Sequence, residues 1–288
     1  MSKIVAVLVW AVAIGTVLTF AGQNLLFGHS LWWFPEGISE HASAIDAQFN
    51  RTLVIVALTF VLSQVALGYI VWQYTNKKSG KAAYSHGNNR LEILWTGITA
   101  LVFVGLGILG QRMWVELHLN EAPPEAIKVN LVAQQFQFNF HYPGPDGVFG
   151  KTEPRFINDS GLNYVGLDPA DAQGKDDSQT TTLAVPAGRP VEVTMRSKDV
   201  IHNFFVPALR FKQDAVPGLS LKVHFTAKTD KVGKYEIPCA ELCGSLHYNM
   251  KSFMLVLPEE EYRELTALDS EKFKEKIDEL LQKYPVSK

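Results

Sequence analysis

The sequence predicts a membrane-anchored α+β protein, in which N-terminal transmembrane helices are followed by a β-sandwich or Greek-key barrel outside the membrane and by a C-terminal helix. Three observations support this fold class: long uncharged apolar segments within residues 1–121, short β-rich runs divided by Pro and Gly within residues 122–258, and a helical pattern within residues 259–288. The formal net charge is −2 and 47% of the residues are hydrophobic, so composition indicates neither a nucleic-acid-binding protein nor a disordered chain.

The membrane anchor, residues 1–121, is predicted to contain spans at about 4–27, 52–74 and 93–115. The segments Ile4–Phe27, Thr52–Tyr74 and Ile93–Gln111 contain no Asp, Glu, Lys or Arg. Each is long enough to cross a hydrocarbon core of roughly 30 Å as a helix. The first segment also resembles a secretion signal, but it is longer than the roughly 7–15 residues of a signal core. We therefore expect it to be retained as a span.

The charges between the spans predict the orientation of the chain. The stretch "TNKKSGKAAYSHGNNR", between the second and third spans, holds four basic residues and no acidic one, whereas residues 28–50 hold three acidic residues and no basic one. The basic residues are Lys77, Lys78, Lys81 and Arg90. Short basic loops stay on the cytoplasmic side. We expect an integral protein of a bacterial cell membrane, with the N-terminus inside and everything after Trp114 on the periplasmic side.

The outer domain is predicted to consist of short strands. The run "IKVNLVAQQFQFNFHY" alternates from Val129 onward and predicts a strand with Phe136, Phe138, Phe140 and Tyr142 on one face. The stretch that follows, residues 143–179, is too long and too polar for a hairpin turn, so we expect a surface excursion. Residues 259–288 have apolar side chains at helical spacing, which predicts one amphipathic helix lying on the domain or on a neighbour.

The stretch "CAELCGSLHYNM", residues 239–250, contains both cysteines of the chain together with a histidine and a methionine. Outside the cytoplasm two cysteines usually form a disulfide. A bridge between Cys239 and Cys243 would close a very short loop and stabilise little. Two thiolates, the His247 imidazole and the Met250 thioether form a soft donor set, which selects copper over magnesium, calcium or manganese. Zinc would accept the cysteines and the histidine but gains little from a thioether.

A second histidine is needed for a copper electron-transfer site, and "SKDVIHNFFVP" supplies His202 on a separate predicted strand. With two cysteines, the site could hold two metals bridged by two sulfurs. Sharing one electron between two coppers spreads the charge and lowers the reorganisation that electron transfer requires. The remaining histidines have no comparable setting and are expected to be structural or solvated; they are His29, His41, His86, His118, His141 and His224.

The stretches "DVIHNFFVPALRFKQDAVPG" and "GKYEIPCAELCGSLHYNM" resemble the dinuclear copper A domain of subunit II of haem–copper cytochrome c oxidases. The resemblance runs from about residue 88 to residue 258 and implies a cupredoxin-like Greek-key fold. It implies that the copper ligands are His202, Cys239, Glu241 through its backbone carbonyl, Cys243, His247 and Met250. It also implies that the Glu241 carboxylate reaches toward a magnesium ion at the contact with the catalytic subunit.

The stretch "NNRLEILWT" resembles the second membrane helix of this family and places Glu92 at the mouth of a proton-uptake path. An acid at the inner edge of a span can alternatively be a snorkelling end-cap. Where the family carries tryptophans, one of them at the surface where electrons arrive from cytochrome c, this chain has Phe136 and Phe138. Phe136 remains the candidate for that role, but its ring is smaller and has no NH group, which favours a tethered cytochrome or a directly docked reductase as donor. Leu219 replaces the family's arginine.

The resemblance implies an electron-accepting subunit II of a terminal oxidase. Electrons from a c-type cytochrome would pass through the dinuclear copper centre to the haem-containing catalytic subunit I, where O₂ reduction is coupled to proton pumping. We expect no haem in this chain, because no Cys-x-x-Cys-His motif is present. Two alternatives stay open: a copper-containing subunit of a nitric oxide reductase, and a copper-free quinol oxidase subunit II. Purified protein without copper would favour the second.

Overall fold

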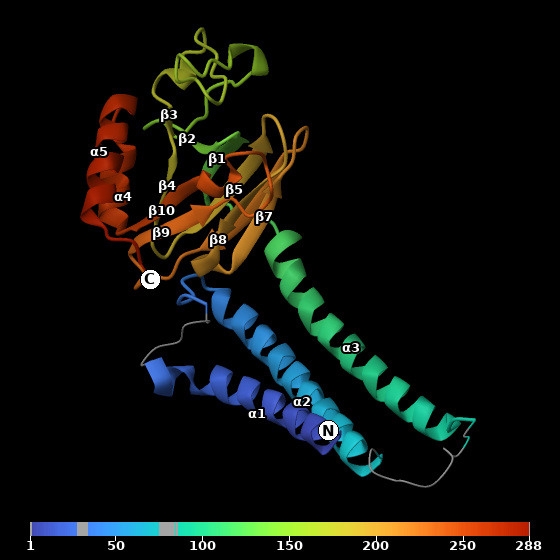
Figure 1. Cartoon of the computed structure of the whole chain (residues 1–288). Coiled ribbons are helices and arrows are strands. Elements are labelled where there is room, and N and C mark those ends of the chain that lie inside the picture. Colours follow the sequence, from blue (N-terminus) through green and yellow to red (C-terminus); the bar gives the residue numbers. More distant parts are fainter. Residues whose placement is uncertain (1, 28–33, 75–83, 85, 288) are drawn as a thin grey trace. The chain divides into compact units, whose positions relative to one another are not determined.

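The membrane anchor contains three long helices. The computed structural model describes residues 2–27, 34–74, 84 and 86–287 (Figure 1). Helices α1 (Ser2–Phe27), α2 (Ala42–Tyr74) and α3 (Asn89–His118) are each long and apolar enough to cross a membrane. They include the three predicted spans and extend beyond them. Lys77, Lys78 and Lys81, on which the predicted orientation depends, lie outside the described residues.

Helices α1 and α2 pack through a tryptophan and a glycine. A Cβ atom on Gly68 would lie 2.1 Å from Trp10 Nε1, so only glycine leaves room for the indole. The Trp10 ring also stacks on Trp72, with 6.0 Å between ring centroids. Small residues that let helices approach closely are the usual basis of helix association in membranes. Helix α3 begins where the Asn88 side chain accepts hydrogen bonds from the backbone amides of Arg90 and Leu91.

The second compact unit contains the β domain. Strands β1 (Ile127–Gln134), β2 (Gln137–Tyr142), β3 (Ser178–Thr180), β5 (Pro190–Ser197) and β8 (Leu221–Thr226) form one sheet in the order β3-β2-β1-β5-β8. Strands β4 (Thr182–Pro186), β10 (Lys251–Leu257) and β9 (Gly233–Pro238) form a second sheet in the order β4-β10-β9, and β6 (His202–Val206) pairs with β7 (Phe211–Ala215). The β1–β5 and β4–β10 pairs are parallel, and the other pairs are antiparallel. Buried side chains from all three sheets form one hydrophobic core, as in a β-sandwich.

The run from residue 127 to residue 142 is a hairpin, so the prediction of one continuous strand was wrong. Strand β1 pairs with β2 in antiparallel register, from Asn130 opposite His141 to Gln134 opposite Gln137. Gln135 and Phe136 form the turn between them. No Gly, Pro, Asn or Asp marks this turn, so the alternation of the sequence continues through it. Phe136 therefore lies at the turn, where it is partly buried against the edge of the hydrophobic core.

The predicted excursion of residues 143–179 ends at residue 177, because β3 begins at Ser178. Residues 143–177 contain two 3₁₀ turns, η1 (Pro154–Phe156) and η2 (Gln173–Lys175), and two isolated β-bridges. The end of the excursion is anchored by Asp177, which is buried. The Asp177 carboxylate lies 2.5 Å from His141 Nε2 and accepts hydrogen bonds from the backbone amides of Gly144 and Gly150 at 3.2 and 2.9 Å. His141 is thus a structural residue, as predicted.

The C-terminal segment forms two helices, α4 (Glu259–Thr266) and α5 (Ser270–Lys283), where one was predicted. The chain breaks before Asp269, whose side chain accepts a hydrogen bond from Lys272 N and so caps α5. The apolar face covers the β domain: Phe273 is buried and its ring centroid lies 5.1 Å from that of Tyr142. Both helices lie beside the β domain (Figure 1), and each has buried apolar side chains.

Residues 34–43, which precede and begin α2, belong to the second compact unit together with residues 114–287. Ile38 is 1% exposed, and its backbone exchanges hydrogen bonds of 2.8 Å with Ala208 and Lys228. The Ser39 hydroxyl donates to the Leu209 carbonyl at 2.7 Å. The sequence pattern did not predict that this segment packs on the β domain.

Candidate metal centre

The candidate ligands come from two segments of the β domain. Residues 239–250 form the loop between β9 and β10 and include the short turn η4 (His247–Asn249), while His202 is the first residue of β6. The two ends of the loop are held together, because Cys239 N donates to the Met250 carbonyl at 3.0 Å. A bridge between Phe204 and Cys239 joins the loop to β6. Sheet pairing therefore brings His202 beside a loop that is distant in sequence.

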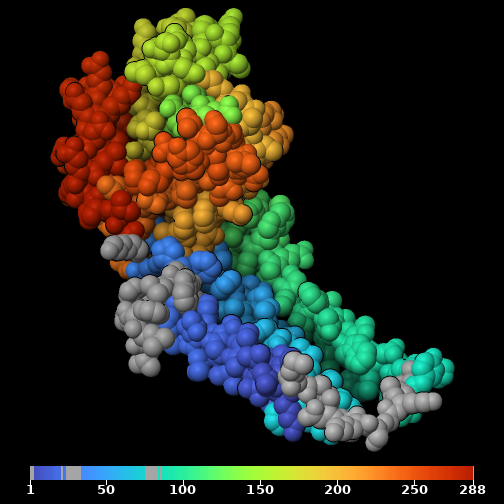
Figure 2. Space-filling model, in the orientation of Figure 1, coloured from blue at the N-terminus to red at the C-terminus, as the bar shows by residue number. Residues whose placement is uncertain are grey.

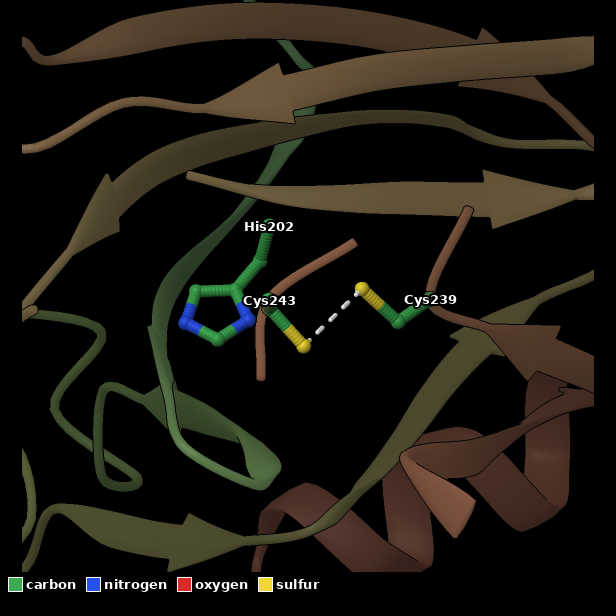
Figure 3. Close-up of side chains that lie close together, drawn as sticks. All are labelled: His202, Cys239 and Cys243. Atoms are coloured by element: carbon green, nitrogen blue, oxygen red, sulfur yellow. Dashed lines mark hydrogen bonds between the residues drawn. The ribbon is translucent and has the colours of Figure 1, made fainter. Parts of the chain in front are cut away.

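Cys243 lies at the centre of the cluster. Its Sγ atom lies 3.9 Å from Cys239 Sγ, 3.5 Å from His247 Nδ1 and 3.7 Å from Met250 Sδ. The ligand atoms of His202, Cys239 and Cys243 all lie within 4.8 Å of one another, and the His202 ring is turned toward the two sulfurs (Figure 3). Both cysteines are free thiols. The structure thus brings together the side chains predicted from the loop and from β6.

The cluster is buried on one side and open on the other. His202, Cys239, Cys243 and Met250 are at most 8% exposed, and His247 is half-buried. The neighbouring loop side chains are exposed; they are Leu242, Leu246 and Tyr248. The cluster is therefore largely shielded from solvent but lies close to the surface.

The arrangement fits a copper site, as the unsatisfied nitrogen of His202 indicates. His202 Nε2 lies 2.8 Å from Asp199 Oδ1, whereas the buried Nδ1 atom has no hydrogen-bond partner among the described residues. Leaving a buried polar atom unpaired costs about 1–3 kcal/mol, and a metal ion would satisfy it. Thiolate–metal bonds are about 2.3 Å long in zinc sites, so sulfurs at the observed separation can share a metal. The thioether of Met250 makes the donor set one that selects copper.

The protonation of the two thiols differs. Burial raises the pKa of Cys239, but the neighbouring His202 ring and the backbone of Asn203 and Glu241 outweigh it and lower that pKa to about 6. Burial and the neighbouring charge of Cys239 raise the pKa of Cys243 to about 11. Burial lowers the pKa of His202, but its contacts with Cys239 and Asp199 raise it more. Metal binding must therefore displace a proton from Cys243.

Two residues that sequence reasoning missed support the ligands. The Asp199 carboxylate contacts His202 and also accepts a hydrogen bond from Gln135 N at 2.7 Å. The side chain of Gln135 donates to the Cys243 carbonyl at 2.6 Å. The position of Asp199 three residues before His202 was a signal that could have been used. Gln135 gave none, because its partner is a backbone carbonyl far along the chain.

The other predicted site residues have different positions. The Glu241 carbonyl oxygen lies 3.3 Å from Cys239 Sγ, while the Glu241 side chain is exposed. Phe136 is half-buried and touches the loop, since a Cβ atom built on Gly244 would lie 3.0 Å from its ring. Leu219 is exposed. Glu92 is in the first turn of α3, in the other compact unit, and is not part of this cluster.

Two family profiles match this chain. Residues 28–112 match the family described as "Cytochrome C oxidase subunit II, transmembrane domain". Residues 166–257 match "Cytochrome C oxidase subunit II, periplasmic domain". The second match includes all the candidate copper ligands.

Similar proteins agree with these matches. An alternative cytochrome c oxidase subunit 2 of Bradyrhizobium diazoefficiens is 34% identical, and the alignment covers 88% of this chain and 89% of the relative. A cytochrome c oxidase subunit 2 of Thermostichus vulcanus is 29% identical, with 88% of this chain and 83% of the relative covered. The solved periplasmic domain of cytochrome oxidase subunit II from Bradyrhizobium japonicum is 25% identical, with a TM-score of 0.38 and coverage of 53% of this chain and 99% of that one. The chain therefore belongs to the cytochrome c oxidase subunit II family, as a membrane-anchored subunit that transfers electrons to the oxidase through a periplasmic domain.

Proposed function

We propose that this subunit holds a dinuclear copper centre, through which it receives electrons from a c-type cytochrome and passes them to the haem-containing catalytic subunit. As a cytochrome c oxidase subunit II, the chain is part of a haem–copper terminal oxidase complex. The identity of the metal, the number of metal ions and the electron donor are the proposed parts of this function. The proposed ligands are His202, Cys239, the carbonyl of Glu241, Cys243, His247 and Met250. When bound, copper held by these residues would supply one-electron transfer, and the two cysteine thiolates would be its sulfur donors.

The observation that carries this proposal is the unpaired, buried His202 Nδ1 beside two free thiols. A structural histidine would satisfy both ring nitrogens with protein groups. Here the protein satisfies only Nε2, through Asp199, and so fixes the tautomer and the orientation of the ring. Around it, Met250 and the core side chains exclude water, which keeps the ligand positions fixed when the charge of the centre changes.

The test counts copper in the purified oxidase complex. A variant with both Cys239→Ser and Cys243→Ser should contain two copper ions fewer per complex than the wild type, because any copper held by other subunits cancels in the difference. Electron paramagnetic resonance of the wild type should show hyperfine coupling to two equivalent copper nuclei. A difference of one copper, or of none, would contradict the dinuclear centre.

The two alternative functions are less well supported. The family assignment selects an oxidase over a nitric oxide reductase. A copper-free quinol oxidase subunit would not need the complete donor set that the loop brings together. The donor set therefore supports the copper-containing form.

We place the arrival of electrons at Phe136, which lies beside the loop that carries Cys243. The exposed loop side chains around the centre include three large apolar ones, since Leu242, Leu246 and Tyr248 are exposed by 78%, 46% and 83%. They lie beside the exposed polar side chains of Glu241, Ser245 and Asn249. The part of the chain that contains this loop reaches the surface, in orange in Figure 2. An apolar edge of this kind suits a c-type cytochrome or a directly docked reductase held by hydrophobic contact.

We assign two further roles to acidic side chains. The Glu241 carboxylate points to solvent while its carbonyl faces Cys239, so one residue could serve copper through its backbone and magnesium through its side chain, at the contact with the catalytic subunit. For Glu92 we propose proton uptake at the inner end of α3. Mn²⁺ retention after Glu241→Gln, measured by paramagnetic resonance, tests the first role.

A further inference from the structure

We propose that Gln135 is a positioning residue for the copper centre, which it serves by tying the segment that carries His202 to the loop that carries Cys243. This inference rests on the proposed dinuclear centre and adds to it a residue that touches no metal. It concerns the turn between β1 and β2, which packs directly on the metal-binding loop.

The backbone of Gln135 supports His202 through Asp199. Gln135 N donates to Asp199 Oδ2 at 2.7 Å, and the other carboxylate oxygen lies 2.8 Å from His202 Nε2. That second oxygen also accepts a hydrogen bond from Val200 N at 2.7 Å. With both oxygens held, the carboxylate has a fixed orientation. It therefore keeps the imidazole ring in place with Nδ1 free for the metal.

The side chain of the same residue supports the loop. Gln135 Nε2 donates to the carbonyl oxygen of Cys243 at 2.6 Å. Cys243 is the residue whose sulfur contacts Cys239, His247 and Met250, so fixing its backbone fixes the centre of the ligand cluster. Because the side chain is bonded at one end and the backbone at the other, Gln135 sets the distance between the two ligand-bearing segments.

The contact between turn and loop leaves no spare room. Gly244 follows Cys243 and has φ +139°, a conformation that residues with a side chain rarely adopt. A Cβ atom there would lie 2.7 Å from Gln135 Nε2 and 3.0 Å from the Phe136 ring. The glycine thus allows the turn to approach the loop closely enough for the hydrogen bond. It also brings Phe136, the proposed point of electron arrival, against the residue after a ligand.

The test replaces Gln135 in the full oxidase complex. Gln135→Met keeps the length of the side chain and the backbone amide but removes the donor to Cys243. We expect the variant to retain both coppers, with altered copper hyperfine splitting and a shifted midpoint potential. Loss of a supporting contact typically lowers metal affinity about 10–100-fold, so the signal of the centre should disappear faster than in the wild type in the presence of a Cu(I) chelator.

Gln137→Met is the matched control, since Gln137 lies two residues on and donates to Asn139 rather than to the loop. It should leave the copper signal, the potential and the release rate unchanged. If Gln135→Met does not accumulate in cells, two other variants can replace it. Gln135→Glu keeps the shape of the side chain but lacks the amide donor. Gly244→Ala adds a Cβ atom that would displace the Gln135 side chain from the loop. Both should reproduce the altered signal.

The outcomes separate this inference from the function on which it rests. A wild-type complex with no dinuclear copper signal would overturn the centre and the role of Gln135 together. A normal wild-type signal that is unchanged in the Gln135 variants, or equally changed by Gln137→Met, would overturn only the positioning role.

Discussion

At the scale of single residues, the site depends on Cys243 more than on any other described side chain. Its sulfur contacts the Cys239 sulfur, the His247 ring and the Met250 thioether, and its carbonyl is held by Gln135. It is also buried in the hydrophobic core. One residue thus belongs both to the metal centre and to the packing that makes it rigid.

We expect Cys243→Ser to abolish the shared-electron signal while leaving the fold intact. A hydroxyl is a hard donor and cannot bridge two soft ions, but it is close in size to a thiol. Paramagnetic resonance reports the signal, and circular dichroism with thermal unfolding reports the fold. A variant that kept coupling to two equivalent coppers would contradict the ligand assignment.

Phe136 should affect electron arrival without affecting the metal. In Phe136→Leu we expect the reduction of copper by its donor to slow severalfold, because the aromatic contact at the surface is lost. The copper spectrum should stay unchanged, since Phe136 is not a ligand. Phe136→Trp restores the aromatic contact and should be no slower than the wild type. Stopped-flow reduction measures both, and equal rates for wild type and Phe136→Leu would place electron arrival elsewhere.

At the scale of elements, the excursion of residues 143–177 depends on one buried carboxylate. Asp177 contacts His141 and two backbone amides, so Asp177→Ala leaves several buried polar groups unpaired. We expect a loss of about 2–5 kcal/mol in the free energy of unfolding of the domain, and faster proteolysis within the excursion. Asp146→Ala is the control, because Asp146 accepts an exposed hydrogen bond from Val148 N within the same excursion. Equal protease resistance of the two variants would show that Asp177 is not the anchor.

The two C-terminal helices are joined by a pH-sensitive contact. Burial raises the pKa of Glu261, but Lys283 and Tyr284 outweigh it and hold that pKa below its usual value. A carboxylate with a lowered pKa in the folded state stabilises the fold at neutral pH, and this contribution is lost as the pH falls through the folded-state value.

Glu261→Gln should therefore be less stable than the wild type near pH 7, by less than about 1 kcal/mol because the contact is at the surface. The difference between the two proteins should vanish in acid, below the usual range of a glutamate. Thermal unfolding at several pH values checks this. A difference that persisted in strong acid would mean that the ion pair is not its cause.

At the scale of the whole molecule, the residues that we propose for electron transfer and for proton uptake lie in different compact units. The candidate copper centre is in the β domain, and Glu92 is in the membrane anchor. A substitution at the copper centre should therefore slow electron transfer but not proton uptake. A substitution at Glu92 should slow proton uptake but not the reduction of copper.

We expect Glu92→Gln to slow proton uptake and turnover while copper reduction by the donor stays at the wild-type rate. The amide cannot carry a proton, but it has nearly the same size as the acid. Glu125→Gln, an exposed acid outside the anchor helices, is the control and should have no effect. Proton uptake by the reconstituted complex and flash reduction of copper give the two rates. Unchanged turnover would make Glu92 an end-cap of α3.

The sequence by itself determined the three apolar helices, the β domain and the identity of the candidate ligands. These features depend on residues that are close together in the sequence. The spans contain long segments without charged residues, and one stretch of twelve residues holds Cys239, Cys243, His247 and Met250. Burial of apolar surface depends on the side chains within one segment, and the choice of metal depends on the donor atoms within one loop. Both can therefore be predicted from short stretches of sequence.

Only the tertiary structure decided how the ligands are held. It split the strand at Gln135, divided the C-terminal helix, packed Ile38 on the β domain and placed Asp199 behind His202. The contacts of Gln135 and of Ile38 are with groups far along the chain, whereas Asp199 and Asp269 each lie three residues from the group that they contact. Every residue has the same backbone carbonyl group. The amino-acid type of the acceptor residue therefore does not reveal that its carbonyl accepts a hydrogen bond.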